Sequence, residues 1–179
     1  MTGTTNTPGG GTRLRPATAQ DADFLTEMLL AAFNWDRPRF TRDELLGTPH
    51  IAHYVTDWSR PGDFGVVAED AAGSLVGAAW ARVFPADDPG YGYVGPGVPE
   101  LTLGVVPAYR GRGVGSALLD ALVKAAIEQP VEGLSLSVED GNAAVRLYMT
   151  RGFLAVGREG SSDTMLLDLA HAPAGRAGT

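Results

Sequence analysis

A chain of 179 residues that is 44% hydrophobic and 20% charged fits one compact domain of an ordinary globular protein. The net charge of −7 argues against nucleic acid as the main partner, because nucleic-acid-binding proteins usually present a basic face. The absence of cysteine excludes disulfides and thiol catalysis, and no apolar run reaches the roughly 18 residues that a membrane span needs.

The two ends of the chain differ from its middle in composition. Residues 1–11 are polar and rich in glycine and threonine, without the apolar core of a signal peptide. We therefore expect a flexible leader over residues 1–11, a single domain over residues 12–169 and a flexible tail over residues 170–179. The absence of cysteine is compatible with a cytoplasmic location, which we expect.

The first half of the chain predicts one strand, a helical region and a hairpin. Thr18 with Asp21, and Thr41 with Glu44, form capping-box pairs that are typical of helix starts. The predicted elements are a strand at 12–18, a helix with apolar residues at helical spacing from 24 to 32, a short helix after residue 38, a helical piece at 49–58, and hairpin strands at 64–70 and 75–84.

The second half predicts a long loop followed by alternating strands and helices. These elements are a loop at 85–97, a strand at 99–106, a helix at 113–129, a strand at 134–138, a helix at 142–151, and strands at 152–158 and 162–169. The whole pattern predicts a mixed α/β (α+β) domain with a largely antiparallel sheet and one βαβ-like crossover.

The stretch "VVPAYRGRGVG", residues 105–115, places three glycines and two arginines before the predicted helix. Glycine in a first turn costs up to about 1 kcal/mol relative to alanine, which indicates that something approaches the backbone closely. A helix N-terminus presents unpaired amides, and phosphate oxygens reach them where β-carbons are missing. With Arg110 and Arg112 adding charge-assisted hydrogen bonds, a pyrophosphate fits this stretch. The alternative is a glycine-rich turn with solvated arginines.

Two motifs make the chain resemble the GNAT N-acetyltransferases. The first is Arg/Gln-x-x-Gly-x-Gly/Ala after a strand ending in Val-x-Pro, and the second is an Asn that opens a helix closing with Tyr and then Gly-Phe. The residues that match are Arg110, Gly113 and Gly115 in the first motif, and Asn142, Tyr148, Gly152 and Phe153 in the second. The resemblance spans residues 13–169 and is strongest over residues 100–153.

The resemblance implies a GNAT-like twisted sheet flanked by helices, with splayed central strands, and acetyl-CoA as co-substrate. The pyrophosphate would lie on the amides of residues 110–116 and the pantetheine beside the end of the strand at 99–106, where Gly104 and Pro107 would fit free backbone groups. A helix cap is a further role for Asn142 and can coexist with a cofactor contact. The implied cofactor-binding residues are Val105, Val106, Arg110, Gly111, Arg112, Gly113, Val114, Gly115, Ser116 and Asn142.

Glu100 and Tyr148 are the candidate acid–base pair for acetyl transfer to an amine. The amine must lose a proton to become a nucleophile, and an acid can protonate the leaving thiolate. Glu100 begins the central strand, where burial should raise its pKa and suit a base, acting directly or through water. Its alternative is a solvated carboxylate. Tyr148 is the acid by family position, and its alternative is core packing with a satisfied hydroxyl.

Aromatic residues near the first helix and the long loop are candidates for the acceptor pocket, although core packing is the alternative for each. Asp87 and Asp88 would attract a cationic amine or merely be solvated. His50, His53 and His171 form no local ligand cluster, so no metal site is predicted. The candidate acceptor residues are Phe33, Trp35, Tyr91 and Tyr93.

The sequence therefore predicts an N-acetyltransferase that acts on a primary amine, most plausibly of a small molecule. Acetylation of a protein N-terminus or lysine is a related version, and a CoA-binding sensor or partner module without turnover is the alternative from another class. The expected partner is a small-molecule or peptide amine, with no nucleic acid and no membrane. Dimers are common in the superfamily, which weakly favours a homodimer.

Overall fold

The computed structural model describes residues 11–170, so most of the predicted leader and tail, and His171, lie outside the described residues. Every predicted strand and helix is present. The strands are β1 (Arg13–Pro16), β2 (Phe64–Glu69), β3 (Leu75–Arg82), β4 (Glu100–Val105), β5 (Gly133–Glu139), β6 (Leu154–Glu159) and β7 (Ser162–Asp168). The α-helices are α1 (Ala22–Phe33), α2 (Arg42–Leu46), α3 (Pro49–Ala52), α4 (Val114–Ile127) and α5 (Ala144–Thr150).

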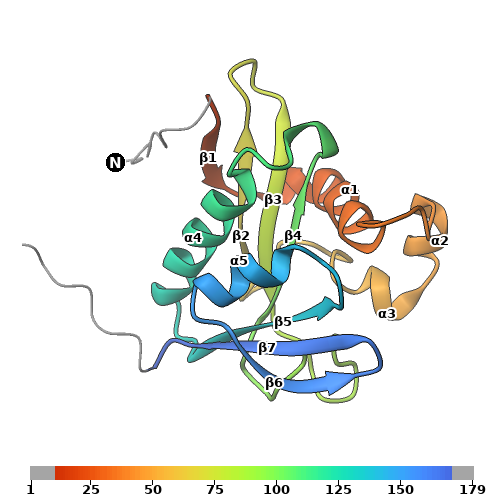
Figure 1. Ribbon diagram of the computed structural model, residues 1–179, viewed down its shortest axis with the longest axis vertical. Helices are drawn as coiled ribbons and strands as arrows, with labels where there is room; N and C mark the ends of the chain where they lie inside the picture. The colour runs from red at the N-terminus through yellow and green to blue at the C-terminus, as the bar shows by residue number, and fades with distance from the viewer. Residues whose placement is uncertain (1–10, 171–179) are drawn as a thin grey trace, which may run out of the picture.

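The strands form one seven-stranded sheet in the order β1-β2-β3-β4-β5-β7-β6. All neighbouring pairs are antiparallel except β4 and β5, which run parallel and share a single register pair, Glu100 with Ser135. Beyond that pair the two strands diverge, and Figure 1 shows β5, β7 and β6 running across the direction of β3 and β4. The predicted mixed sheet with splayed central strands is confirmed.

Helices cover both faces of the sheet, with α1 on one side and α4 on the other (Figure 1). Side chains alternate across a strand, and accordingly Val66 and Ala68 of β2 join the apolar cluster under α4 while Val67 joins the cluster under α1. On α4, Leu118 and Leu122 are fully buried, and burial of such a side chain contributes about 1.5–3 kcal/mol. These two layers hold β4 rigidly between them.

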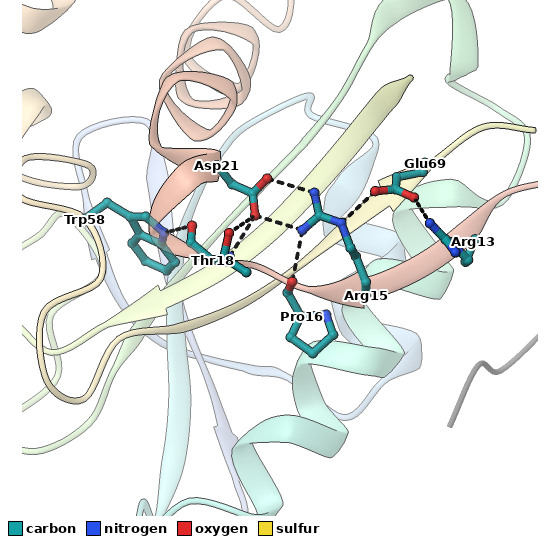
Figure 2. Close-up of polar contacts among 7 residues, drawn as sticks. All are labelled: Arg13, Arg15, Pro16, Thr18, Asp21, Trp58 and Glu69. Atoms are coloured by element: carbon teal, nitrogen blue, oxygen red, sulfur yellow. Dashed lines mark hydrogen bonds and ion pairs between the residues drawn. The ribbon is translucent and has the colours of Figure 1, made fainter. Parts of the chain in front are cut away.

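A charged network ties β1 to β2 and to the start of α1 (Figure 2). The Arg15 guanidinium donates to Asp21 at 2.9 Å and to Glu69 at 2.6 Å, and Arg13 donates to Glu69 at 2.5 Å. These arginines hold the pKa values of Asp21 and Glu69 below their usual range. The Thr18 amide also donates to Asp21 at 2.7 Å. The network therefore fixes where α1 begins.

The predicted helical piece at residues 49–58 is shorter than expected. Only α3 is regular, and it is followed by turns that carry His53 and Tyr54 inward. Within residues 11–170, no helix is long and apolar enough to cross a bilayer.

Candidate active site

A cavity of about 1260 Å³ lies where β4 and β5 diverge. Its lining comes from the end of α1 and the segment after it, β4, the start of α4, the end of β5, α5 and the β6–β7 turn. Small-molecule sites usually measure roughly 300–1,000 Å³. The cavity therefore has room for a large ligand together with a smaller second one.

The start of α4 forms one end of this cavity. Gly111 and Gly113 have φ angles of +71° and +82°, in the left-handed region that glycine adopts without steric cost. Within the described chain, the amides of residues 111–116 have no hydrogen-bond acceptor. Gly111, Gly113, Gly115 and Ser116 line the cavity. Unpaired amides and the positive end of a helix dipole are features that suit an anion, and the sequence-based assignment of a phosphate site here stays a prediction.

The remaining predicted cofactor residues lie around this end in different ways. Arg110 lines the cavity, and its Nε donates to the Val105 carbonyl at 3.3 Å. The Arg112 guanidinium instead stacks over the Tyr109 ring at 5.2 Å. Val105 lines the cavity, whereas Val114 packs in the core under α4 and Val106 against the cluster under α1. Arg112, Val106 and Val114 are therefore not among the cavity-lining residues.

Gly104 allows helix α1 to pack closely against β4. A β-carbon at this position would lie 2.5 Å from the carbonyl oxygen of Met28 on α1. The close approach that this glycine permits is that of α1 on the sheet. Gly104 also lines the cavity, so the place beside pantetheine that the resemblance implies for it stays a prediction.

Glu100 is buried at the point where β4 and β5 part, with 4% of its surface exposed. Its Oε1 accepts hydrogen bonds from the Tyr54 hydroxyl at 2.6 Å and the Gly92 amide at 2.9 Å, while its buried Oε2 has no partner. Burial raises the pKa of Glu100 to about 7, and the two hydrogen bonds oppose that rise. This burial excludes the solvated-carboxylate interpretation.

Tyr148 lies on the opposite wall, on α5, and its side chain lines the same cavity. Its ring packs on Phe153 at 5.7 Å between centroids, and only 7% of the residue is exposed. Burial raises the pKa of the phenol. Within residues 11–170 its hydroxyl has no hydrogen-bond partner, which leaves it free to act on a ligand. Nearby, Asn142 lines the cavity, and its side chain accepts from the Ala144 amide at 3.0 Å. The N-cap residue of α5 is Ala143, so Asn142 lies one residue before the predicted cap position.

The other end of the cavity is aromatic and acidic. Of the predicted acceptor residues, Phe33, Trp35 and Tyr91 line it, whereas Tyr93 packs in the cluster under α1. The Trp35 indole donates to Glu139 at 3.3 Å. These aromatic side chains form a wall beside a carboxylate, an arrangement that can receive an organic cation.

Several residues of this end escaped the sequence analysis. Arg39 donates to Glu139 at 2.6 Å and to Asp36 at 2.7 Å, and this contact with Arg39 holds the pKa of Glu139 below its usual range. Glu159, on the β6–β7 hairpin, also lines the cavity. The sequence analysis also did not identify Tyr54, which contacts Glu100 although the two residues lie 46 positions apart in the chain. No local pattern marks such long-range partners.

The acidic residues that line the cavity are not the two aspartates expected from the sequence. Asp87 and Asp88 do not line the cavity, and Asp88 lies 3.0 Å from Nδ1 of His53. His50 does line it, with its ring 5.9 Å from that of Tyr91. The residues that the structure describes contain no group of three histidine or acidic side chains placed to hold a metal. The acidic groups of the cavity are Glu100, Glu139 and Glu159.

Comparisons with known proteins identify the family and the fold of the chain. Residues 24–153 match the model of the acetyltransferase (GNAT) family. A mycothiol acetyltransferase of Propionibacterium freudenreichii is 41% identical over 101 residues, which is 56% of this chain and 30% of that protein. The chain thus spans about a third of the length of this relative.

Solved structures share the fold. The ribosomal-protein-alanine N-acetyltransferase of Brucella melitensis superposes with a TM-score of 0.64 at 26% identity, over 87% of this chain and 98% of that one. A GNAT superfamily phosphinothricin acetyltransferase of Sinorhizobium meliloti, in complex with acetyl-CoA, superposes with a TM-score of 0.61 at 22% identity, over 90% of each chain.

Proposed function

Because the chain belongs to the GNAT acetyltransferase family, we propose that it transfers the acetyl group of acetyl-CoA to a primary amine of a small molecule. One observation carries this proposal: a single cavity contains the free amides at the start of α4, Glu100 and Tyr148. The acetyl-CoA complex of the Sinorhizobium neighbour supports the choice of co-substrate.

The residues present fit acetyl-CoA at the α4 end. The amides of residues 111–116 would hold the diphosphate, with Arg110 beside them. Between β4 and β5 only Glu100 and Ser135 are in register, so the later main-chain groups of β4 are not paired with β5 and can bond a pantetheine arm. When bound, acetyl-CoA supplies a thioester carbonyl for the amine to attack and a sulfur that leaves as thiolate.

The two acid–base groups would divide the proton transfers between them. Glu100 would take the proton that the attacking ammonium must lose, at Oε2 and directly or through one water. With a pKa of about 7, a large share of Glu100 is ionised near neutral pH and ready to accept it. Tyr148 would donate its hydroxyl proton to the leaving sulfur, since it lines the cavity and no group within residues 11–170 makes a hydrogen bond to that hydroxyl.

The acceptor end supports a cationic amine as the substrate class. Glu139 and Glu159 place negative charge there, and Arg39 offsets only part of it. Phe33, Trp35 and Tyr91 would cover the apolar part of the acceptor. The mycothiol acetyltransferase names of the relatives support a small molecule, while the name of the Brucella neighbour keeps a protein N-terminus as the related alternative.

The test is release of free thiol from acetyl-CoA in the presence of amines. The panel contains small primary amines, mycothiol-related amines, and peptides with a free N-terminus or lysine. We expect at least one small amine to increase thiol release, with kcat/KM rising as pH increases through about 7 and then levelling, because the base acts when ionised.

Two outcomes would redirect the assignment. Binding of CoA with no amine increasing thiol release would favour a CoA-binding module without turnover. Faster release with peptides than with any small amine would move the acceptor to the protein class. In Glu100→Gln the rise of kcat/KM through pH 7 should be absent. This variant therefore tests whether ionisation of Glu100 causes the rise.

A further inference from the structure

We propose that Tyr54 is a positioning residue for Glu100: its hydroxyl holds one carboxylate oxygen so that the other is the oxygen left to accept the substrate proton. The inference rests on the proposed role of Glu100 as the base. Tyr54 lies in the turn after α3, and only 4% of its surface is exposed.

A directed chain of hydrogen bonds carries this inference. The Tyr91 amide donates to the Tyr54 hydroxyl oxygen at 2.8 Å, and the Tyr54 hydroxyl donates to Oε1 of Glu100 at 2.6 Å. The Gly92 amide donates to the same Oε1 at 2.9 Å. Both donors thus converge on one oxygen. Oε2 is buried without any partner, so it is the oxygen whose lone pairs are not already used by a hydrogen bond.

The loop that carries these amides also fixes the position of Oε2. Gly90 lies so close that a β-carbon there would overlap Oε2 of Glu100. Contact with a glycine offers no competing side-chain donor. The carboxylate is therefore packed against residues 90–92 and the Tyr54 hydroxyl, with Oε1 bonded and Oε2 without a partner.

The Tyr54 ring is itself held independently of Glu100. It contacts the rings of His53 and Phe84 at centroid distances of 4.9 and 5.0 Å. The Trp80 indole donates to the Tyr54 carbonyl at 3.0 Å. The hydroxyl is thus positioned by packing, and the carboxylate is positioned by the hydroxyl.

Other polar groups around Glu100 are either engaged elsewhere or make no bond to it. Arg82 on β3 is its register partner, but the Arg82 guanidinium pairs with Asp63 at 2.7 Å and donates to main-chain carbonyls. His53 faces Asp88, and Ser135 on β5 has a buried hydroxyl without a partner. Tyr148 faces the cavity from α5. Among residues 11–170, Tyr54 supplies the one side-chain hydrogen bond to Glu100.

Removing the hydroxyl in Tyr54→Phe has a specific consequence. The hydrogen bond stabilises the anion more than the neutral acid, so its loss raises the pKa of Glu100, by roughly one unit. On the acid side of the pH–rate profile, kcat/KM should then fall about tenfold, with little change on the alkaline plateau. A purely structural role would lower the rate equally at every pH.

Two readouts test this in the full chain. One is the pKa of the Glu100 carboxyl by ¹³C NMR, with the signal assigned from Glu100→Gln; the other is the acid limb of kcat/KM. Upward shifts of both in Tyr54→Phe support the proposal. An unchanged carboxyl pKa, or an equal loss of rate at all pH values, overturns it. If the pKa of the Glu100 carboxyl shifts and the acid limb of kcat/KM does not, the hydrogen bond from Tyr54 is supported but Glu100 as the base is contradicted.

A matched variant and a wild-type measurement guard against a folding defect. Leu122→Ala removes packing in the separate apolar cluster under α4 and leaves the Tyr54 ring and its hydroxyl untouched, so it should lower Tm and leave both midpoints unchanged. In the wild-type chain, the Tyr54 hydroxyl proton should titrate with the midpoint of Glu100. A hydroxyl resonance that does not respond to that titration would overturn the proposal without any variant.

Discussion

The two ends of the cavity are built in opposite ways. The α4 end is a continuous stretch, residues 105–116, that offers mainly main-chain amides. The acceptor end collects side chains from α1, the turn after α3, the loop at 85–97, β5 and the β6–β7 hairpin. The proposed main-chain site for the diphosphate is thus encoded locally by glycines, whereas the proposed acid–base pair depends on segments that only the fold brings together.

The largest effect should come from the residue that lies between the two ends. In Tyr148→Phe the acid is lost, so turnover should fall by up to ~10²–10⁴-fold while CoA affinity stays nearly unchanged. Steady-state thiol release and CoA titration measure the two quantities separately. Full turnover in a folded variant would assign Tyr148 to packing alone.

A substitution at the α4 end should instead weaken CoA binding. Gly113→Asp adds a side chain at φ +82° and a negative charge beside the proposed diphosphate site. We expect CoA to bind at least about tenfold more weakly, corresponding to ~1.4 kcal/mol. Isothermal titration with CoA measures this loss.

Gly73→Asp is the matched control for that variant. Gly73 has the same φ of +82° but lies in the β2–β3 turn, and it is not among the residues that line the cavity. It should lose similar stability and keep its CoA affinity. Equal CoA affinity in the two variants would contradict the diphosphate site.

A further prediction concerns the stability of the folded chain, which the burial of Glu100 lowers where this carboxyl is ionised. The folded-state pKa of Glu100 is about 7, above its ordinary 4.5, so ionisation favours the unfolded chain as pH rises from about 4.5 through 7. Glu100→Gln cannot ionise. Its free energy of unfolding relative to wild type should therefore increase across that window, by up to ~3 kcal/mol. Denaturant unfolding at pH 5 and pH 8 measures it, and a pH-independent difference would contradict the buried-acid description.

This contrast also explains what the sequence could predict. The glycines at 111 and 113 pointed to an unusual backbone before α4, because the left-handed φ that they adopt depends on local sequence. Burial of Glu100 followed from its place on the central strand. The strand and helix order was equally local, because periodicity and capping pairs mark each element.

What the sequence could not predict needs three-dimensional neighbours. Tyr54 looked like one aromatic residue in a helical piece, and only the turn after α3 brings it to Glu100. Asp88 looked like part of an acidic pocket, but His53 engages it. Gly104 packs against the carbonyl of Met28 on α1, a contact between distant parts of the chain that no local pattern shows.

The most direct test of the central claim is a crystal structure of the protein with CoA. We expect the diphosphate on the amides of residues 111–116, the pantetheine between β4 and β5, and the sulfur within hydrogen-bond reach of the Tyr148 hydroxyl. CoA bound elsewhere, or a sulfur far from both Tyr148 and Glu100, would contradict it.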